Sequence, residues 1–261
     1  MLKIVTWNVN SLRVRLPQVL EWLQQHQPDV MALQETKLTD AAFPHAAFTE
    51  IGYHAVFAGQ KTYNGVALLS RIASQTTITT LPTLNDEQQR FLAATYSFQD
   101  KELHIVNVYV PNGAELGCDK YFYKLRWLES LYCYLQESIQ QFSNIVVLGD
   151  FNIAPTDADV LNPTDWIDSI LTSDSERQAL QHLCDLGLFD AFRLFSQPEH
   201  SFSWWNYQAG SFRRNDGARI DLILLTNSLK AMAKNCYIDI APRRLPRPSD
   251  HTPVVLELQT F

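Results

Sequence analysis

Short apolar runs recur along the whole chain, and turn residues separate them. Runs of this kind are typical of strands, and runs without polar alternation indicate strands that are buried on both faces. The pattern predicts about eleven strands, at residues 3–10, 29–36, 52–59, 65–71, 93–98, 103–110, 144–150, 201–205, 219–226, 236–241 and 252–259.

Three segments place apolar residues at helical spacing instead. Pro17 is expected to open the first helix, which Pro28 ends. The second covers residues 119–141, and the third begins at the capping box 173–176 and ends at Gly187. Strands with short connections, and helices between some of them, predict an α/β fold in which two mixed sheets pack together under outer helices.

Composition places the chain among single globular domains. Of its 261 residues, 46% are hydrophobic and 19% are charged. No repeat or linker divides the sequence, so residues 1–261 are expected to form one domain. No signal peptide and no membrane span is expected. The four cysteines lack metal-binding spacing, which favours free thiols and a cytoplasmic location.

The net charge of −7 argues against general electrostatic attraction to nucleic acid. A local basic rim remains possible, and its candidates are Lys61 with Arg71, Arg213 with Arg214, and Arg243, Arg244 and Arg247. Each such group, taken alone, is more often a solvated loop.

Polar side chains stand where the predicted strands end. The buried run 146–148 leads through Gly149 to Asp150 and Asn152. Other strand ends carry Asn8, Asn10, Glu35, Lys37, Tyr109, Asn112, Trp204, Trp205, Asp250 and His251. One such residue is usually an ordinary turn residue. Their repetition predicts a rim of strand ends that carries out chemistry.

Asp221 differs because it lies inside an apolar run, between Ile220 and Leu222. A carboxylate is costly to bury without a partner. An imidazole is a natural partner, and His251 is the best candidate.

The residue types favour metal-assisted chemistry on a phosphate. Carboxylates without cysteines or clustered histidines suit Mg²⁺ or Mn²⁺ and not zinc, and they are Glu35, Asp150, Asp221 and Asp250. Neutral donors that can hold a phosphate are Asn8, Asn112, Asn152 and Tyr109. No Gly-rich phosphate loop is found. The set therefore predicts phosphodiester cleavage.

Eight motifs, in chain order, give a family resemblance: TWNVNSLR, PDVMALQETKL, GVALLSR, NVYVPNG, LGDFNIAPTDAD, FSWWNY, GARIDLIL and PSDHTPV. Together they resemble the exonuclease III family of DNA-repair nucleases, the class II abasic-site endonucleases of the endonuclease/exonuclease/phosphatase superfamily. The resemblance covers nearly the whole chain. It implies a four-layer sandwich of two mixed sheets with helices outside.

The resemblance also implies a metal site. Glu35 would bind Mg²⁺, or Mn²⁺ in its place, and the nearby groups would be Asn8, Asp150, Asn152, Asp250 and His251. One or two metals are both compatible with the sequence, and Asn10 stands where some relatives carry an acidic residue.

Catalytic roles follow from the same resemblance. Asp150 would deprotonate or position the attacking water, and Asn152 would help to orient it. Tyr109 would contact the scissile phosphate, and Asn112 would help as a substrate contact. His251, oriented by Asp221, would neutralise charge on the phosphate oxygens. Either Asp150 or His251 could be the general base, and Asp150 is favoured.

The implied partner is double-stranded DNA with abasic or damaged 3′ ends, and a monomer is expected. Trp204, beside Ile220, would line the damage pocket, which Ala218 would leave roomy, and Trp205 would be a further substrate contact. Backbone contacts would come from Lys61, Arg213, Arg214 and Arg219. The sequence does not rank abasic-site incision, 3′-to-5′ exonuclease and 3′-phosphatase activities.

Two alternatives remain. A superfamily phosphatase acting on a small phosphorylated molecule or a lipid would use the same catalytic residues. The aromatic pair and the basic loop that follows it favour a polymer instead. An inactive nucleic-acid-binding relative would lack some catalytic residues, and none is replaced here.

Overall fold

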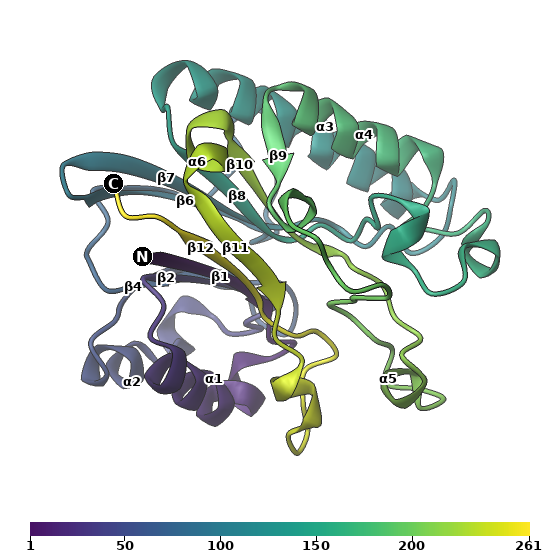
Figure 1. Cartoon of the computed structure of the whole chain (residues 1–261), viewed down its shortest axis with the longest axis horizontal. Coiled ribbons are helices and arrows are strands. Elements are labelled where there is room, and N and C mark those ends of the chain that lie inside the picture. Colours follow the sequence, from purple (N-terminus) through teal and green to yellow (C-terminus); the bar gives the residue numbers. More distant parts are fainter.

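The computed structural model describes residues 1–261 and contains two six-stranded sheets that pack face to face (Figure 1). In spatial order, the first sheet consists of β11 (Ala233–Ile238), β12 (Val254–Leu258), β1 (Leu2–Asn8), β2 (Val30–Gln34), β4 (Val66–Ser70) and β3 (His54–Ala58). The second consists of β5 (Thr76–Ile78), β6 (Phe91–Phe98), β7 (Lys101–Tyr109), β8 (Ile145–Asp150), β10 (Asp221–Thr226) and β9 (Leu188–Asp190).

Helices cover the outer faces of both sheets, as Figure 1 shows. The first sheet carries α1 (Leu12–His26) and α2 (His45–Glu50), and the second carries α3 (Asp119–Gln141) and α4 (Asp174–Asp185). Two short helices, α5 (Ser211–Arg214) and α6 (Asn227–Met232), and five 3₁₀ turns complete the chain. The expected four-layer α/β sandwich is confirmed. No helix combines the length and the apolar character needed to cross a bilayer.

Each central strand serves two hydrophobic cores, because successive side chains point to opposite faces. In β8, Val146 and Leu148 enter the core between the sheets, whereas Ile145 and Val147 enter the core under α3 and α4. This explains why the strand has no polar alternation in its sequence. The core between the sheets contains 23 buried residues contributed by both sheets, and it fixes the sheets relative to each other.

The direction of the strands determines where a site can form. β1 pairs with β2 in parallel, β7 pairs with β8 in parallel, and the other pairs are antiparallel. The carboxyl ends of both parallel pairs lie at one end of the sandwich, because Asn8, the last residue of β1, reaches Asp150, the last residue of β8. The loops that leave these strands therefore meet.

Three expectations about elements are wrong in detail. α1 begins at Leu12, so Pro17 lies inside the helix and does not open it. Proline has no N–H to donate to the carbonyl of Arg13. Pro17 and Arg13 are both exposed, so this carbonyl is on the solvent side of the helix. Residues 201–205 form only an isolated bridge at Trp204. The short edge strands β5 and β9 were not expected, because three residues are too few for a periodic signal.

Candidate active site

The rim of strand ends predicted from the sequence exists, and its register brings the acidic residues together. In the second sheet, Asp150 of β8 lies opposite Tyr109 of β7 on one side and opposite Asp221 of β10 on the other. Across the sandwich, the side-chain amide of Asn8 donates to Asp150 Oδ2 at 2.9 Å and to Glu35 Oε1 at 3.0 Å. The Asn8 amide thus links the acidic residues at the strand ends of the two sheets.

Asp150 is held rigidly in the interior. Gly149 precedes it at φ 146°, and a Cβ there would lie 1.9 Å from the carbonyl oxygen of Val108, so only glycine allows this close approach of strands. Asp150 is 1% exposed. Its Oδ1 accepts from the backbone N–H of Asn152 at 2.9 Å. Burial raises the pKa of Asp150 to about 7, although the His251 cation opposes this.

Glu35 follows β2 in the left-handed conformation, at φ 51°. Its carboxylate accepts from Asn8 and forms an ion pair with Lys37 at 2.8 Å. The phenol of Tyr109 lies beside it, and burial, followed by the charges of Glu35 and Asp150, raises the pKa of Tyr109 well above its ordinary value. Tyr109 therefore remains a neutral hydrogen-bond donor at the site.

Asp221 and His251 form the pair expected from the sequence. His251 Nδ1 lies 2.8 Å from Asp221 Oδ2, and Ser203 Oγ donates to the same oxygen at 2.6 Å. The other ring nitrogen, Nε2, lies 3.6 Å from Asp150 Oδ2. Burial lowers the pKa of His251, but the carboxylates of Asp221 and Asp150 outweigh burial and raise it to about 10. The imidazole is therefore a cation at neutral pH.

The site has a group of residues that could hold a metal ion. Glu35, Asp150 and His251 each place one ligand-type atom within 4.8 Å of the others, and because a protonated imidazole cannot bind a metal, the ligands in this state would be the two carboxylates. Asp250, expected near the metal, is not in this group. Its carboxylate accepts from Asn10 Nδ2 at 2.9 Å and from Trp204 Nε1 at 3.1 Å, so it links two walls of the site.

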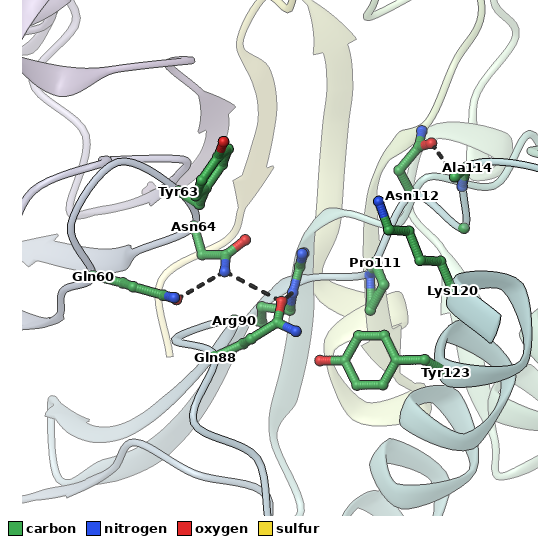
Figure 2. A pocket seen from close by; sticks show the side chains of 11 residues that line it. Gln60, Tyr63, Asn64, Gln88, Arg90, Pro111, Asn112, Ala114, Lys120 and Tyr123 are labelled. Atoms are coloured by element: carbon green, nitrogen blue, oxygen red, sulfur yellow. Dashed lines mark hydrogen bonds between the residues drawn. The ribbon is translucent and has the colours of Figure 1, made fainter.

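The amides of Asn112 and Asn152 meet beside the acidic group. Asn112 Nδ2 donates to Asn152 Oδ1 at 3.1 Å, and Asn152 Nδ2 donates to the carbonyl of Val110 at 3.0 Å. Asn112 also lines a polar pocket of about 500 Å³ that opens between the two sheets, with Asn64, Gln88 and Arg90 on its other side (Figure 2). Lys61 is exposed in the neighbouring loop, and its expected contact with a substrate stays a prediction.

Trp204 and Ile220 lie together, as the damage-pocket prediction requires. Trp204 is half-buried and packs on a small apolar cluster that contains Ile220, Ala218 and Leu171. Backbone bridges join Trp204 to Ala218 and to His251. The cluster therefore borders the acidic group directly.

Two predicted substrate contacts are wrong. Trp205 is 1% exposed and packs edge-on against Phe212, so its ring is part of the interior. Arg219 is also 1% exposed, and its guanidinium pairs with Asp159 at 2.6 Å and with Asp190 at 2.7 Å. Neither side chain can reach a DNA backbone. Arg213 and Arg214, in contrast, are exposed on α5, which projects from the sandwich (Figure 1).

Three polar residues that the sequence alone does not single out support the site. Ser203 donates to Asp221, and the guanidinium of Arg90 lies 4.6 Å from the centre of the Tyr109 ring. Lys124 is fully buried beneath the loops that carry Asn112 and Asn152. The sequence does contain a sign that Lys124 is buried, because it lies four residues before Leu128 and therefore on the apolar face of α3.

Residues 5–251 match the sequence profile of the Endonuclease/Exonuclease/phosphatase family. The chain belongs to this family. It is 33% identical to exodeoxyribonuclease III of Haemophilus influenzae over 99% of this chain and 100% of that protein. The resemblance to the exonuclease III family is thereby confirmed.

Solved structures of family members superimpose on nearly the whole chain. The 3′ phosphatase NExo from Neisseria, bound to a product DNA hairpin, is 43% identical, with a TM-score of 0.96 over 99% of this chain and 100% of that one. An AP endonuclease from Archaeoglobus fulgidus is 38% identical, with a TM-score of 0.94 over 99% of both chains. The site described above therefore lies in the fold that these enzymes share.

Proposed function

We propose that the protein is a metal-dependent DNA-repair phosphodiesterase that cleaves the backbone 5′ to abasic sites and also trims damaged 3′ ends as a 3′-to-5′ exonuclease and 3′-phosphatase. The observation that carries the proposal is the group of Glu35, Asp150 and His251 within 4.8 Å, beside a half-buried tryptophan. The relatives support it, since they include enzymes named for abasic-site, exonuclease and 3′-phosphatase activities.

The residues present fit Mg²⁺. The donor set is rich in carboxylates and contains no thiol, and hard divalent cations prefer oxygen ligands. Glu35 would be the principal ligand, because it is the less buried of the two carboxylates and an ion with its bound waters can reach it more easily. When bound, the ion would neutralise charge on the phosphate oxygens.

The electrostatics favour Asp150 over His251 as the general base. A general base must be unprotonated, and His251 is a cation at neutral pH because two carboxylates face it. Asp150, whose pKa lies near 7, can take a proton from a water molecule, and Asn152 next to it can orient that water. His251 then places a positive donor where negative charge develops on the phosphate.

The substrate class follows from the apolar cluster and the exposed arginines. An abasic sugar carries no base and rotates out of the duplex at lower cost than an intact nucleotide. A wall made of Trp204 and Ile220 suits such a bare sugar. Arg213 and Arg214 on α5 can contact phosphates, which position a duplex without reading its sequence.

The test is a substrate panel. Duplexes with one abasic-site analogue, with a 3′ phosphate, with an intact recessed 3′ end, and an inositol phosphate are each incubated with Mg²⁺ or with excess chelator. We expect cleavage of the DNA substrates in Mg²⁺ only. Hydrolysis of the inositol phosphate without cleavage of damaged DNA would support the small-molecule phosphatase and reject the proposal.

Trp204→Ala tests the role of the pocket in substrate discrimination separately from the role of the catalytic residues in hydrolysis. The variant is expected to lose discrimination between abasic and intact duplex by about 10-fold, the scale of one or two kcal/mol of apolar contact, while hydrolysis of a small phosphodiester changes less. A melting curve is the control, because a purely structural tryptophan would lower the melting temperature and reduce all activities together.

A further inference from the structure

Lys124 is an unusual residue, because a lysine is almost never fully buried unless it is paired. It lies on α3, among the apolar side chains that pack against the second sheet, and it is 0% exposed. No charged group of the acidic site contacts its ammonium. Its place in the interior therefore needs a separate explanation.

Three acceptors surround the ammonium, one for each of its donors. Lys124 Nζ forms an ion pair with Glu176 of α4, whose side chain is also 0% exposed. It donates to the backbone carbonyl of Asn152 at 2.6 Å and to that of Asn112 at 3.3 Å. Lys124 thus joins two helices to the two loops that carry the site's amides.

The loop at Asn152 needs such support. Asn152 adopts the left-handed conformation at φ 49°, which asparagine tolerates better than most L-residues but does not adopt by default, so its contacts must select it. Its side chain must meet both Asn112, at 3.1 Å, and Asp150, at 3.3 Å. A fixed carbonyl at Asn152 fixes the orientation of this side chain.

Glu176 extends the same connection to the damage pocket. Its Oε1 also accepts from the backbone N–H of Leu171 at 3.1 Å, and its Oε2 accepts from Ser173 in the capping box of α4. Leu171 packs in the apolar cluster with Ile220, and its carbonyl accepts from Ala154, two residues after Asn152. One buried ion pair therefore contacts both the catalytic loop and the pocket wall.

We propose that Lys124 is a positioning residue: its buried ammonium, paired with Glu176, holds the carbonyls of Asn112 and Asn152 so that their side-chain amides are aligned with Asp150. The inference rests on the proposed function. A buried ion pair can often be replaced by uncharged groups with little loss of stability, so the fold alone does not require this one. A hydrophobic pair, however, has no donor for the two carbonyls.

Two variants isolate the ammonium. Glu176→Gln removes the charge of the partner but keeps a residue that serves in a capping box. Lys124→Met in that Glu176→Gln background then removes the donor and leaves a side chain of similar length. Leu128→Ala is the matched control, because it creates a cavity on the same face of α3 and removes no hydrogen bond to either loop.

Each variant is compared by melting temperature, by kcat and KM on the abasic duplex, and by the ¹H–¹⁵N resonances of the Asn112 and Asn152 side-chain amides without substrate. Glu176→Gln is expected to melt earlier than the wild type, because it leaves the buried Lys124 ammonium without a counter-charge, and its kcat is the reference for the double variant. The double variant is expected to fold and to shift both amide resonances. Its kcat is expected to fall by about 10- to 100-fold with KM little changed, which is the scale of a small misplacement of catalytic groups. Leu128→Ala is expected to melt earlier with kcat and resonances unchanged.

The proposal is overturned if the folded double variant matches Glu176→Gln in kcat and in both resonances. It is equally overturned if the double variant is unfolded at the assay temperature, or if Leu128→Ala loses as much kcat, because the pair would then serve stability alone. A wild-type protein that cleaves none of the DNA substrates refutes the proposed function instead, and the resonances still report whether Lys124 places the two amides.

Discussion

At the scale of single residues, the chemistry of the site comes from groups whose surroundings push their pKa values apart. Burial raises the pKa of Asp150 to about 7 despite the hydrogen bonds that it accepts, and the two carboxylates that face His251 outweigh its burial and raise its pKa to about 10. Between these values the site holds an unprotonated carboxylate beside a charged imidazole. Such a pair is suited to general base catalysis with charge stabilisation.

The rate is therefore expected to depend on pH with two limbs. It should rise as the pH passes through about 7, where Asp150 loses its proton, and fall as the pH passes through about 10, where His251 loses its charge. Asp150→Asn should lower kcat at pH 8 by at least ~10²-fold and abolish the lower limb, as for loss of a general base. Binding of the duplex, measured without Mg²⁺, should stay similar. An unchanged lower limb in the variant would remove Asp150 from this role.

The contact between Asp221 and His251 predicts coupled losses. Asp221→Ala leaves the imidazole unoriented, and His251→Ala removes the donor, so each should cost ~10²–10³-fold in kcat, the scale of one transition-state donor. The double variant should be little worse than either single variant, because the two act as a unit. The measurement is a double-mutant cycle on the abasic duplex, and strictly additive losses would show that the residues act independently.

At the scale of elements, strands supply rigidity and loops supply function. Asp150 ends a strand whose six residues are all buried, whereas the loop from Trp204 to Arg219 is held by bridges to Ala218 and His251 and by the packing of Trp205. The aromatic residues at the start of this loop have high strand propensity and therefore predict a strand at 201–205, where the structure has only isolated bridges at Trp204. Its tip, α5, remains exposed and basic.

The two kinds of arginine in this loop are expected to behave differently. Arg213→Ala with Arg214→Ala should weaken binding to abasic and intact duplexes equally and should reduce the salt dependence of binding, by about one unit of slope for each lost phosphate contact. Arg219→Ala should leave that slope unchanged and should lower stability by roughly 1–3 kcal/mol, because it removes one of the two arginine partners of the buried Asp159 and the ion pair of Asp190. Binding titrations at several salt concentrations, with a urea melt of each variant, test both statements. An unchanged slope in the double variant would place the DNA elsewhere.

At the scale of the whole molecule, the two sheets cannot separate without exposing the core between them. That core takes residues from both sheets, and the bond from Asn8 to Asp150 joins the sheets at the site. The site is therefore present only in the closed sandwich. The expectation of a single domain over residues 1–261 follows the same logic and remains a prediction.

If the chain is one domain, unfolding should be a single cooperative event. Urea unfolding followed by far-UV circular dichroism and by tryptophan fluorescence should give coincident transitions. The tryptophans report on several parts of the molecule, since Trp7 lies in the core under α1 and Trp127 in the core under α3. Two separated transitions would show that the sheets unfold as independent units.

The sequence by itself determined what is local. Apolar runs indicated the strands, the capping box located the start of α4, and the motifs identified the family and the strand ends that carry Glu35, Asp150 and Asn152. It also indicated the contact between Asp221 and His251, because a carboxylate inside an apolar run needs a partner. In each case the signal lies in the residue and its immediate neighbours.

Only the tertiary structure decided which polar side chains face solvent. Arg219 resembled a DNA contact in the sequence, yet it is buried because Asp159, 60 residues away, reaches it in the fold. Lys124 is likewise buried because Glu176, 52 residues away, reaches it from α4. The burial of a charge depends on whether a remote partner offsets its desolvation, and that partner is chosen by the packing of the whole chain.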